Sequence, residues 1–200
     1  MGFDFFAGDL SIDFINTLDP HAESAPQDDS LKSYRDLVDW AAQAGVLNAS
    51  QRALRLRLAK EKPQAAEAAF RQAIQLRGSL HRLVLALMER HSPASDDLRR
   101  FNMFLSNAQA HLQLHTTPEG YRLRLENDLQ LSSLLWPIAS AASRLLTSED
   151  AHFIRRCDAE SCRGFFIDRS KNHSRRWCDM KVCGNRAKAR QYYLQQKKNR

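Results

Sequence analysis

The sequence predicts a mainly α-helical protein with a small β-hairpin: a helical N-terminal domain over residues 1–147 and a C-terminal treble-clef-like zinc finger over residues 151–200. Three observations predict this fold class. Apolar residues recur at helical spacing through most of the first domain, strict alternation is confined to a short stretch near its end, and all four cysteines lie in the last quarter of the chain. Two hundred residues with 43% hydrophobic content suffice for one sizeable core with a small satellite module.

The first apolar stretch, residues 3–18, fits two structures. From Leu10 to Phe14 apolar and polar residues alternate as in a strand, but Leu10, Phe14 and Leu18 also share one face of a helix. A short helix with Asp9 as its N-cap is the favoured interpretation.

Four helices are expected from start and stop signals in the middle of the chain. Ser30 can cap a helix that ends at Gly45, and a second start follows at Ser50. Pro63 suits the first turn of a long helix that is central to the core, and Ser95 begins another.

The pattern changes after that helix. Residues 111–115 and 121–125 alternate on either side of Thr117-Pro118-Glu119-Gly120, which predicts a β-hairpin. Residues 128–147 return to helical spacing, with a kink expected at Pro137.

The four cysteines form two C-x4-C pairs separated by fifteen residues. Two close pairs joined by a short loop can provide the tetrahedron of thiolates that zinc requires. A disulfide or four unrelated buried thiols are the alternatives, but nothing else in the chain suggests export to an oxidising compartment. We therefore expect one structural Zn²⁺ per chain, bound by Cys157, Cys162, Cys178 and Cys183.

The apolar residues around the cysteines predict how the finger folds. Residues 153–154 and 165–167 can form two strands with the first cysteine pair on the turn between them. Cys183 would lie in the first turn of a terminal helix, whose positive end favours thiolates. The helical period also places Leu194 on the side of the metal and the core.

The sequence around the cysteines, CDAESCRGFFIDRSKNHSRRWCDMKVCGNRAKAR, resembles the zinc finger of the CGNR family, whose tetrapeptide stands here at residues 183–186. Near the N-terminus, GDLSIDFINTL at residues 8–18 and YRDLVDW at residues 34–40 resemble the ABATE domain that accompanies this finger. The resemblance implies a stress-induced transcription regulator.

The charge of the chain is unevenly distributed. Residues 151–200 hold 14 Lys and Arg against 4 Asp and Glu, whereas residues 1–150 hold 16 against 19. Such an excess predicts an anionic partner, which we expect to be duplex DNA. Asn185 and Arg186 are the best placed to reach base edges. The candidate nucleic-acid-binding residues are Arg169, Lys171, Arg175, Arg176, Asn185, Arg186, Lys188 and Arg190.

A second function class stays open. Arginines near a zinc ion held by four thiolates can simply offset the negative charge of that site. The alternative is therefore a zinc-stapled protein-interaction module whose basic tail touches nucleic acid only non-specifically.

The N-terminal domain offers a candidate pocket for a small-molecule effector, lined by Asp13, Asn16, Thr17, Arg35 and Trp40. The same residues could equally serve as helix caps and satisfied core groups, which is the favoured interpretation. An oligomeric state is compatible with the sequence but not specified by it.

Other classes are disfavoured. A nuclease on a treble-clef scaffold would need a second histidine on the terminal helix, which has none. The sequence contains no nucleophile elbow, phosphate loop or dinucleotide glycine motif, so we do not expect an enzyme. Without a basic leader or a long apolar run, a cytoplasmic protein with no membrane partner is expected.

Overall fold

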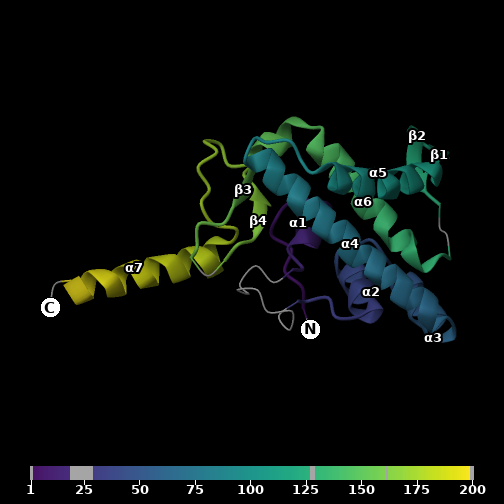
Figure 1. Cartoon of the computed structure of the whole chain (residues 1–200), viewed down its shortest axis with the longest axis horizontal. Coiled ribbons are helices and arrows are strands. Elements are labelled where there is room, and N and C mark those ends of the chain that lie inside the picture. The colour runs from purple at the N-terminus through teal and green to yellow at the C-terminus, as the bar shows by residue number, and fades with distance from the viewer. Residues whose placement is uncertain (1, 19–28, 127–128, 161, 199–200) are drawn as a thin grey trace.

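A computed structural model describes residues 2–18, 29–126, 129–160 and 162–198. Within these ranges, six α-helices build the body, and a seventh leaves it (Figure 1). The helices are α1 (Leu10–Ile15), α2 (Tyr34–Gln43), α3 (Ala49–Glu61), α4 (Pro63–Met88), α5 (Ser95–Ala110), α6 (Leu135–Leu146) and α7 (Asn185–Lys198). The strands are β1 (Leu112–Thr117), β2 (Gly120–Leu125), β3 (Ile154–Arg156) and β4 (Phe165–Ile167).

Helix α4 is the axis of the body. Its 26 residues span about 39 Å, and Figure 1 shows it crossing the molecule with α5 and α6 on one side and α2 and α3 on the other. Pro63 occupies its first turn, where the missing N–H leaves no bond unmade, as expected. Leu76, Leu80 and Val84 are buried along the helix. The other helices therefore pack around α4.

One hydrophobic core runs from the helical body into the finger. It contains fully buried Phe14, Trp40 and Ile138 from the helices, together with Ile154 and Phe165 from the strands β3 and β4. The body and the β3–β4 sheet therefore share buried apolar surface.

The ambiguous N-terminal stretch contains a helix. The Asp9 side chain accepts a hydrogen bond from Ser11 N at 2.8 Å and caps α1, as favoured from the sequence. Leu18 lies beyond the helix and is 46% exposed.

Two of the expected helix starts are shifted. Ser33, not Ser30, caps α2 by accepting a hydrogen bond from Asp36 N, and α3 begins at Ala49, one residue before Ser50, with Asn48 as its cap in a reciprocal pair with Gln51. Ser95 is the first residue of α5, as expected. An N-cap residue has an extended backbone, and its side-chain oxygen accepts a hydrogen bond from a free N–H group. Several neighbouring polar residues can meet this condition, so the sequence alone does not fix which of them caps the helix.

Pro137 lies at the start of a helix and not inside one continuous helix over residues 128–147, as the expected kink required. A short 3₁₀ helix over Leu131–Leu134 precedes α6, so Pro137 falls in the first turn of α6. A proline in the first turn removes no hydrogen bond and has no cause to bend the helix.

The predicted hairpin is confirmed. β1 and β2 pair antiparallel, from Leu112 opposite Leu125 to Thr117 opposite Gly120. In Figure 1 the hairpin lies at the end of the molecule opposite to α7. Among the described residues, no helix is long and apolar enough to cross a membrane.

A candidate zinc site and the helix that leaves it

The first cysteine pair lies on the turn that joins the two short strands of the finger. β3 and β4 pair antiparallel, and Cys157 N donates to Gly164 O at 2.9 Å where the sheet ends. Cys162 N donates to Ala159 O at 2.8 Å, which closes a tight turn. The backbone thus brings both sulfurs to the same side of the turn, as the sequence predicts.

The second pair lies on the turn that leads into α7. This turn is a π-helical segment, Met180–Gly184, and it is capped by Asp179, which accepts from Val182 N at 2.9 Å. A Cβ atom added at Gly184 would lie 2.5 Å from the Met180 sulfur, so the close approach favours glycine here. Cys183 therefore lies in the π-helical segment, two residues before α7, and not in the first turn of the terminal helix as expected.

The four sulfur atoms are arranged as a metal would require. All of them lie within 4.8 Å of one another, and the Cys178 sulfur is 3.6 Å from those of both Cys162 and Cys183. With Zn–S bonds of about 2.3 Å, sulfurs at the corners of a tetrahedron are about 3.8 Å apart. A disulfide would instead need about 2.05 Å, and all four cysteines are free.

The thiols also need a cation to ionise together. Hydrogen bonding to Cys162 and burial raise the pKa of Cys178, and burial raises the pKa of Cys183 to about 12. Each thiolate formed opposes ionisation of the next, so one ionised sulfur disfavours the others. A divalent cation at the centre of the cluster would remove this conflict.

These observations fit one structural zinc ion bound by Cys157, Cys162, Cys178 and Cys183. Each of the four residues is buried, with at most 6% of its surface exposed. Four protein ligands complete the tetrahedron and leave no open position for a substrate, as in structural zinc sites. The role of the ion is to hold the two turns together.

The finger is hydrogen-bonded to the N-terminal segment. The Asn16 side chain donates to Phe165 O at 2.8 Å and accepts from Phe165 N at 2.9 Å. Ile167 N donates to Ala7 O at 3.0 Å. Residues on either side of α1 thus bind to β4.

The loop after β4 is organised by a buried carboxylate. Asp168 is fully buried and accepts hydrogen bonds from Ser170 N, Ser170 Oγ and Arg175 N, at 2.6–3.0 Å. Burial opposes ionisation, but these donors outweigh it and hold the pKa of Asp168 below its usual range. The structural role of Asp168 was not predicted from the sequence. An Asp two residues before a Ser is a turn-forming pattern that could have indicated it.

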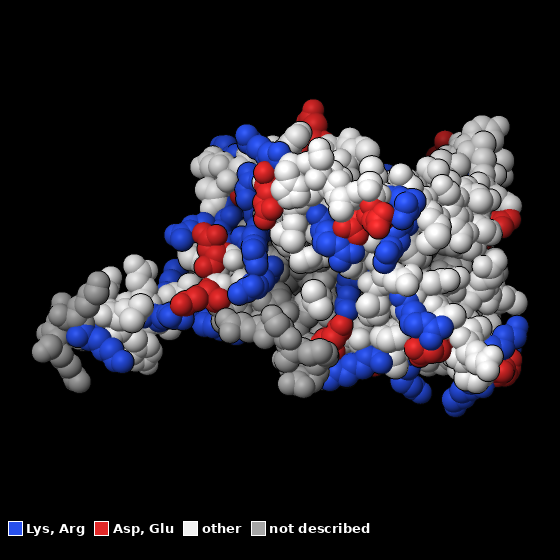
Figure 2. Space-filling view, viewed as in Figure 1, with Lys and Arg blue, Asp and Glu red and all other residues white. Residues whose placement is uncertain are grey.

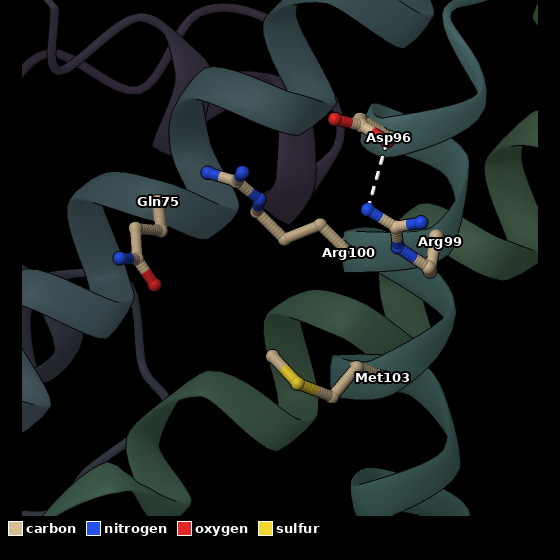
Figure 3. A pocket seen from close by; sticks show the side chains of 5 residues that line it. All are labelled: Gln75, Asp96, Arg99, Arg100 and Met103. Atoms are coloured by element: carbon tan, nitrogen blue, oxygen red, sulfur yellow. Dashed lines mark hydrogen bonds and ion pairs between the residues drawn. The ribbon is translucent and has the colours of Figure 1, made fainter.

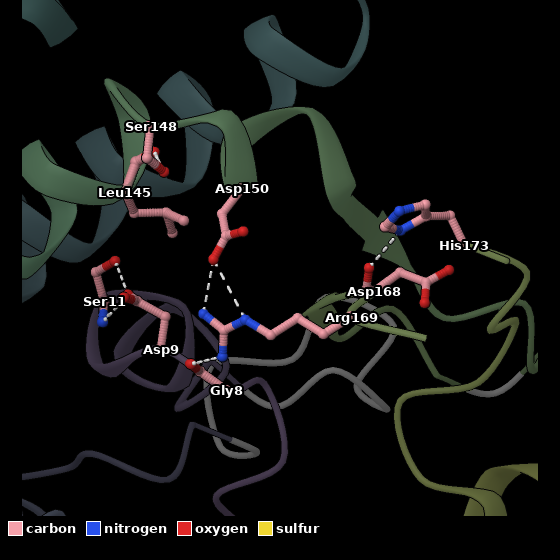
Figure 4. A network of polar contacts seen from close by, with 9 residues as sticks. All are labelled: Gly8, Asp9, Ser11, Leu145, Ser148, Asp150, Asp168, Arg169 and His173. Carbon is pink, nitrogen blue, oxygen red and sulfur yellow. Dashed lines mark hydrogen bonds and ion pairs between the residues drawn. The ribbon is translucent and has the colours of Figure 1, made fainter. Parts of the chain in front are cut away.

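The arginines of this loop are bound to the protein. Figure 4 shows Arg169 reaching across to Asp150 and to the carbonyl oxygen of Gly8, at 2.8 and 2.9 Å. Arg175 donates to the carbonyl oxygens of Trp177, at 2.9 Å, and of Cys178, and lies over the Phe166 ring with 4.5 Å to the centroid.

Arg176 pairs with Asp158 at 2.8 Å and also lies over the Trp177 ring. It remains exposed to solvent, as does Lys171.

Helix α7 leaves the body next to the zinc site and extends away from it (Figure 1). It contains no Asp or Glu, and Asn185, Arg186, Lys188 and Arg190 are all exposed. Figure 2 shows basic side chains on this arm and acidic ones beside its base, where Arg190 pairs with Glu160. Leu194 was expected to face the core but is 52% exposed, because the helix continues beyond the body that would bury it.

The five residues of the candidate pocket do not line a common cavity in the part of the chain that the structure describes. Trp40 is fully buried against Phe14, Asp13 accepts from the N–H groups of Phe6 and Ala7, and Arg35 is exposed.

The other two members of that set are also occupied by protein partners. Asn16 bonds to β4, and Thr17 accepts from Arg77 at 3.0 Å. Arg77, a buried arginine paired with Asp29, was not identified from the sequence, since its helical position predicts only that it lies among apolar residues.

An open cleft of about 550 Å³ lies between α4 and α5 instead (Figure 3). Gln75, Arg100 and Met103 line it, together with an exposed ion pair between Arg99 and Asp96 at 2.8 Å.

Comparison with protein families is consistent with this geometry. Residues 8–149 match the ABATE family model, described as "Putative stress-induced transcription regulator". Residues 154–196 match the model of the CGNR zinc finger. A search of curated proteins gave no match. The chain therefore belongs to the ABATE family of transcription regulators and carries a CGNR zinc finger at its C-terminal end.

Proposed function

We propose that the finger binds duplex DNA and that α7 is the element that enters the major groove. The observation that carries this proposal is the projection of α7, which extends into solvent beyond the zinc site with cationic and no anionic side chains. A helix of 14 residues is about 21 Å long, and the major groove, about 12 Å wide, admits an α-helix.

The composition of α7 supports contact with a polyanion. Its sequence gives it no apolar stripe, so nothing in it favours packing against another helix. Arg186, Arg190 and Lys197 recur at intervals that place them on one face of the helix, together with Tyr193. Such a row of cations matches the phosphates that border a groove.

The stability of α7 also favours a partner. An isolated helix of this length is marginal in water, and the exposed side chains of Tyr192, Tyr193 and Leu194 gain no burial from the body. Binding in a groove would order the helix and cover these side chains.

A charge-reversal pair tests the proposal. Arg186→Glu with Arg190→Glu should abolish DNA binding while the protein keeps one zinc ion, since neither residue is a ligand. The matched control is Arg57→Glu with Arg71→Glu, which changes the net charge equally at exposed positions of α3 and α4. Binding measured over a range of salt concentrations should fall for wild type and control with a log–log slope of about −0.9 per phosphate contact.

The competing function is a protein-interaction module that touches nucleic acid only non-specifically. If the reversed α7 variant bound DNA as tightly as wild type, the cations of α7 would only offset the thiolate charge, and this alternative would replace the proposal. Selection of binding sites from random duplexes separates specific from non-specific contact, because only the former enriches a sequence.

We further infer that the N-terminal body transmits an effector or assembly signal to the finger through α1. Supporting this are the hydrogen bonds between β4 and Asn16, the residue that caps the C-terminal end of α1. A ligand of the body should raise the melting temperature of the full chain by mass action and change its DNA affinity. If the ligand changed the melting temperature but not the DNA affinity, the body would not transmit a signal to the finger.

A further inference from the structure

The β1–β2 hairpin has one apolar face and one polar face, and both are exposed. Residues directly opposite one another share a face, so the register places Leu114 beside Leu123 and Thr116 beside Tyr121 on the apolar face. The other face carries His115 opposite Arg122, with Arg124 beside them.

This alternation is the pattern of a strand that is buried on one side. The chain does not provide that burial within its described residues: Leu114 is 64% exposed, Leu123 59% and Tyr121 75%. Leu125 at the foot of the hairpin packs against the main core. His111, just before β1, stacks on Trp136 at 3.8 Å. The foot is therefore anchored, while the apolar face beyond it has no cover.

We propose that this face is a self-association surface, on which the hairpins of two copies of the chain stack face to face. No charged residue lies on the apolar face, so stacking two copies brings no like charges together. A nucleic acid would instead favour the arginine face. The hairpin lies at the opposite end of the molecule from α7 in Figure 1, so the surface does not overlap the DNA-binding element.

The face is least exposed at its foot and most exposed at its tip, from Leu112, at 38%, to Tyr121, at 75%. A two-fold axis near the Leu114–Leu123 pair would place the Tyr121 end of one hairpin over the Leu112 end of its partner. Such a contact is isologous, since the same residues meet on both sides.

The exposed apolar area of the hairpin indicates how tightly two copies should associate. The exposed apolar side chains present on the order of 300–500 Å² per copy, the size of the largest patch on a typical monomer. Stacking two faces would then bury roughly 600–1,000 Å², below the area of stable specific interfaces and in the range of weak, transient ones. The dimer should therefore be weak, with a dissociation constant in the micromolar range or above.

Sedimentation of the full zinc-loaded chain over a wide concentration range tests this surface. Wild type should pass from monomer to dimer. Leu114→Gln with Leu123→Gln should weaken association by about 100-fold or more, because each dimer loses four leucines from its interface. The control, His115→Gln with Arg122→Gln, alters the adjacent pair on the polar face and should dimerise like wild type.

A monomeric wild type at all concentrations, or equal dimerisation of the leucine variant, would overturn the proposal. Binding of a monomeric wild type to phospholipid vesicles would assign the face to a lipid surface instead. Hydrogen exchange of the unmodified protein gives a readout that does not depend on a variant's folding: the protection of the amides of residues 112–125 should increase as the protein concentration rises. Protection independent of concentration would also contradict self-association.

Discussion

The loop of residues 169–176 and the helix α7 are both rich in cations, yet they use them differently. In the loop, Arg169 and Arg175 turn towards backbone carbonyl oxygens and aromatic or acidic side chains of the protein itself. In α7, Lys188 and Lys197 lie on a helix that leaves the body and are exposed to solvent, although Arg190 near its base pairs with Glu160. Both regions have a positive net charge. Net charge alone therefore does not distinguish cations that bind to the protein itself from those available to a partner.

The difference has a physical cause. The loop has no regular secondary structure to satisfy its carbonyl groups, and guanidinium groups, with five donors in a planar fork, can do so. A helix satisfies its own backbone through i to i−4 hydrogen bonds, which leaves its side chains for other contacts. The loop thereby uses its arginines for folding, whereas α7 presents exposed cations that we propose serve recognition.

Removing the metal should disorder both the loop and α7, and we expect it to have the largest effect on stability. A structural zinc ion contributes on the order of 10 kcal/mol of folding free energy, and the sheet beneath it shares the main core. Cys178→Ser should lose zinc and expose both the loop and α7 to hydrogen exchange. It should also lower the melting temperature of the body.

The melting temperature of the body tests whether the zinc ion also stabilises the shared core. If its melting temperature stayed unchanged while zinc was lost, the finger would be an independent unit despite the shared core. Retention of a full zinc equivalent would remove Cys178 from the ligand set.

Within the loop, Arg175→Ala should cost stability. Its guanidinium makes charge-assisted bonds to Trp177 and Cys178, which together contribute about 2–3 kcal/mol. Lys171→Ala, which removes an exposed cation from the same loop, is the control and should leave the unfolding free energy unchanged. Denaturant titration of both variants measures the difference, and equal stabilities would mean that Arg175 is as available to DNA as any cation of α7.

The binding of the N-terminal segment to β4 should also depend on pH through Asp13. This carboxylate accepts from the N–H groups of Phe6 and Ala7, and the carbonyl oxygen of Ala7 in turn accepts from Ile167 N. Burial raises the pKa of Asp13 from its ordinary 3.8 to about 6. The folded state therefore binds the proton more tightly than the unfolded state, and the stability that protonation provides is lost as the pH rises from about 4 to 6.

Asp13→Asn keeps the accepting oxygen and removes the titration. The variant should be more stable than wild type at pH 7 by roughly 1–3 kcal/mol, and the gap should close below pH 4. Chemical denaturation at several pH values measures it. A gap that stayed constant with pH would show that Asp13 does not titrate in this range.

The smallest expected effect is on α7. Lys188→Ala should leave stability and zinc content unchanged and reduce the magnitude of the salt slope of DNA binding by about one unit on every sequence. A loss confined to one preferred sequence would instead identify Lys188 as a base contact.

Sequence by itself determined the elements of this protein that depend on local chemistry. The spacing of the cysteines predicted the metal ligands, because few other arrangements bring four thiols together. Helical and alternating periods predicted the long helix α4 and the β1–β2 hairpin, since the period of apolar residues follows directly from backbone geometry. Helix caps were predicted less well, as at Ser30 and Ser50, because several neighbouring residues can cap.

Only the tertiary structure decided which groups face inward. The sequence could not show that Arg175 bonds to Cys178, that Asn16 bonds to Phe165, or that Leu194 lies beyond the edge of the body, because each depends on segments far apart in the chain or on where the body ends. An arginine or a leucine has the same intrinsic preferences wherever it stands, and the surrounding fold determines whether a partner lies within reach.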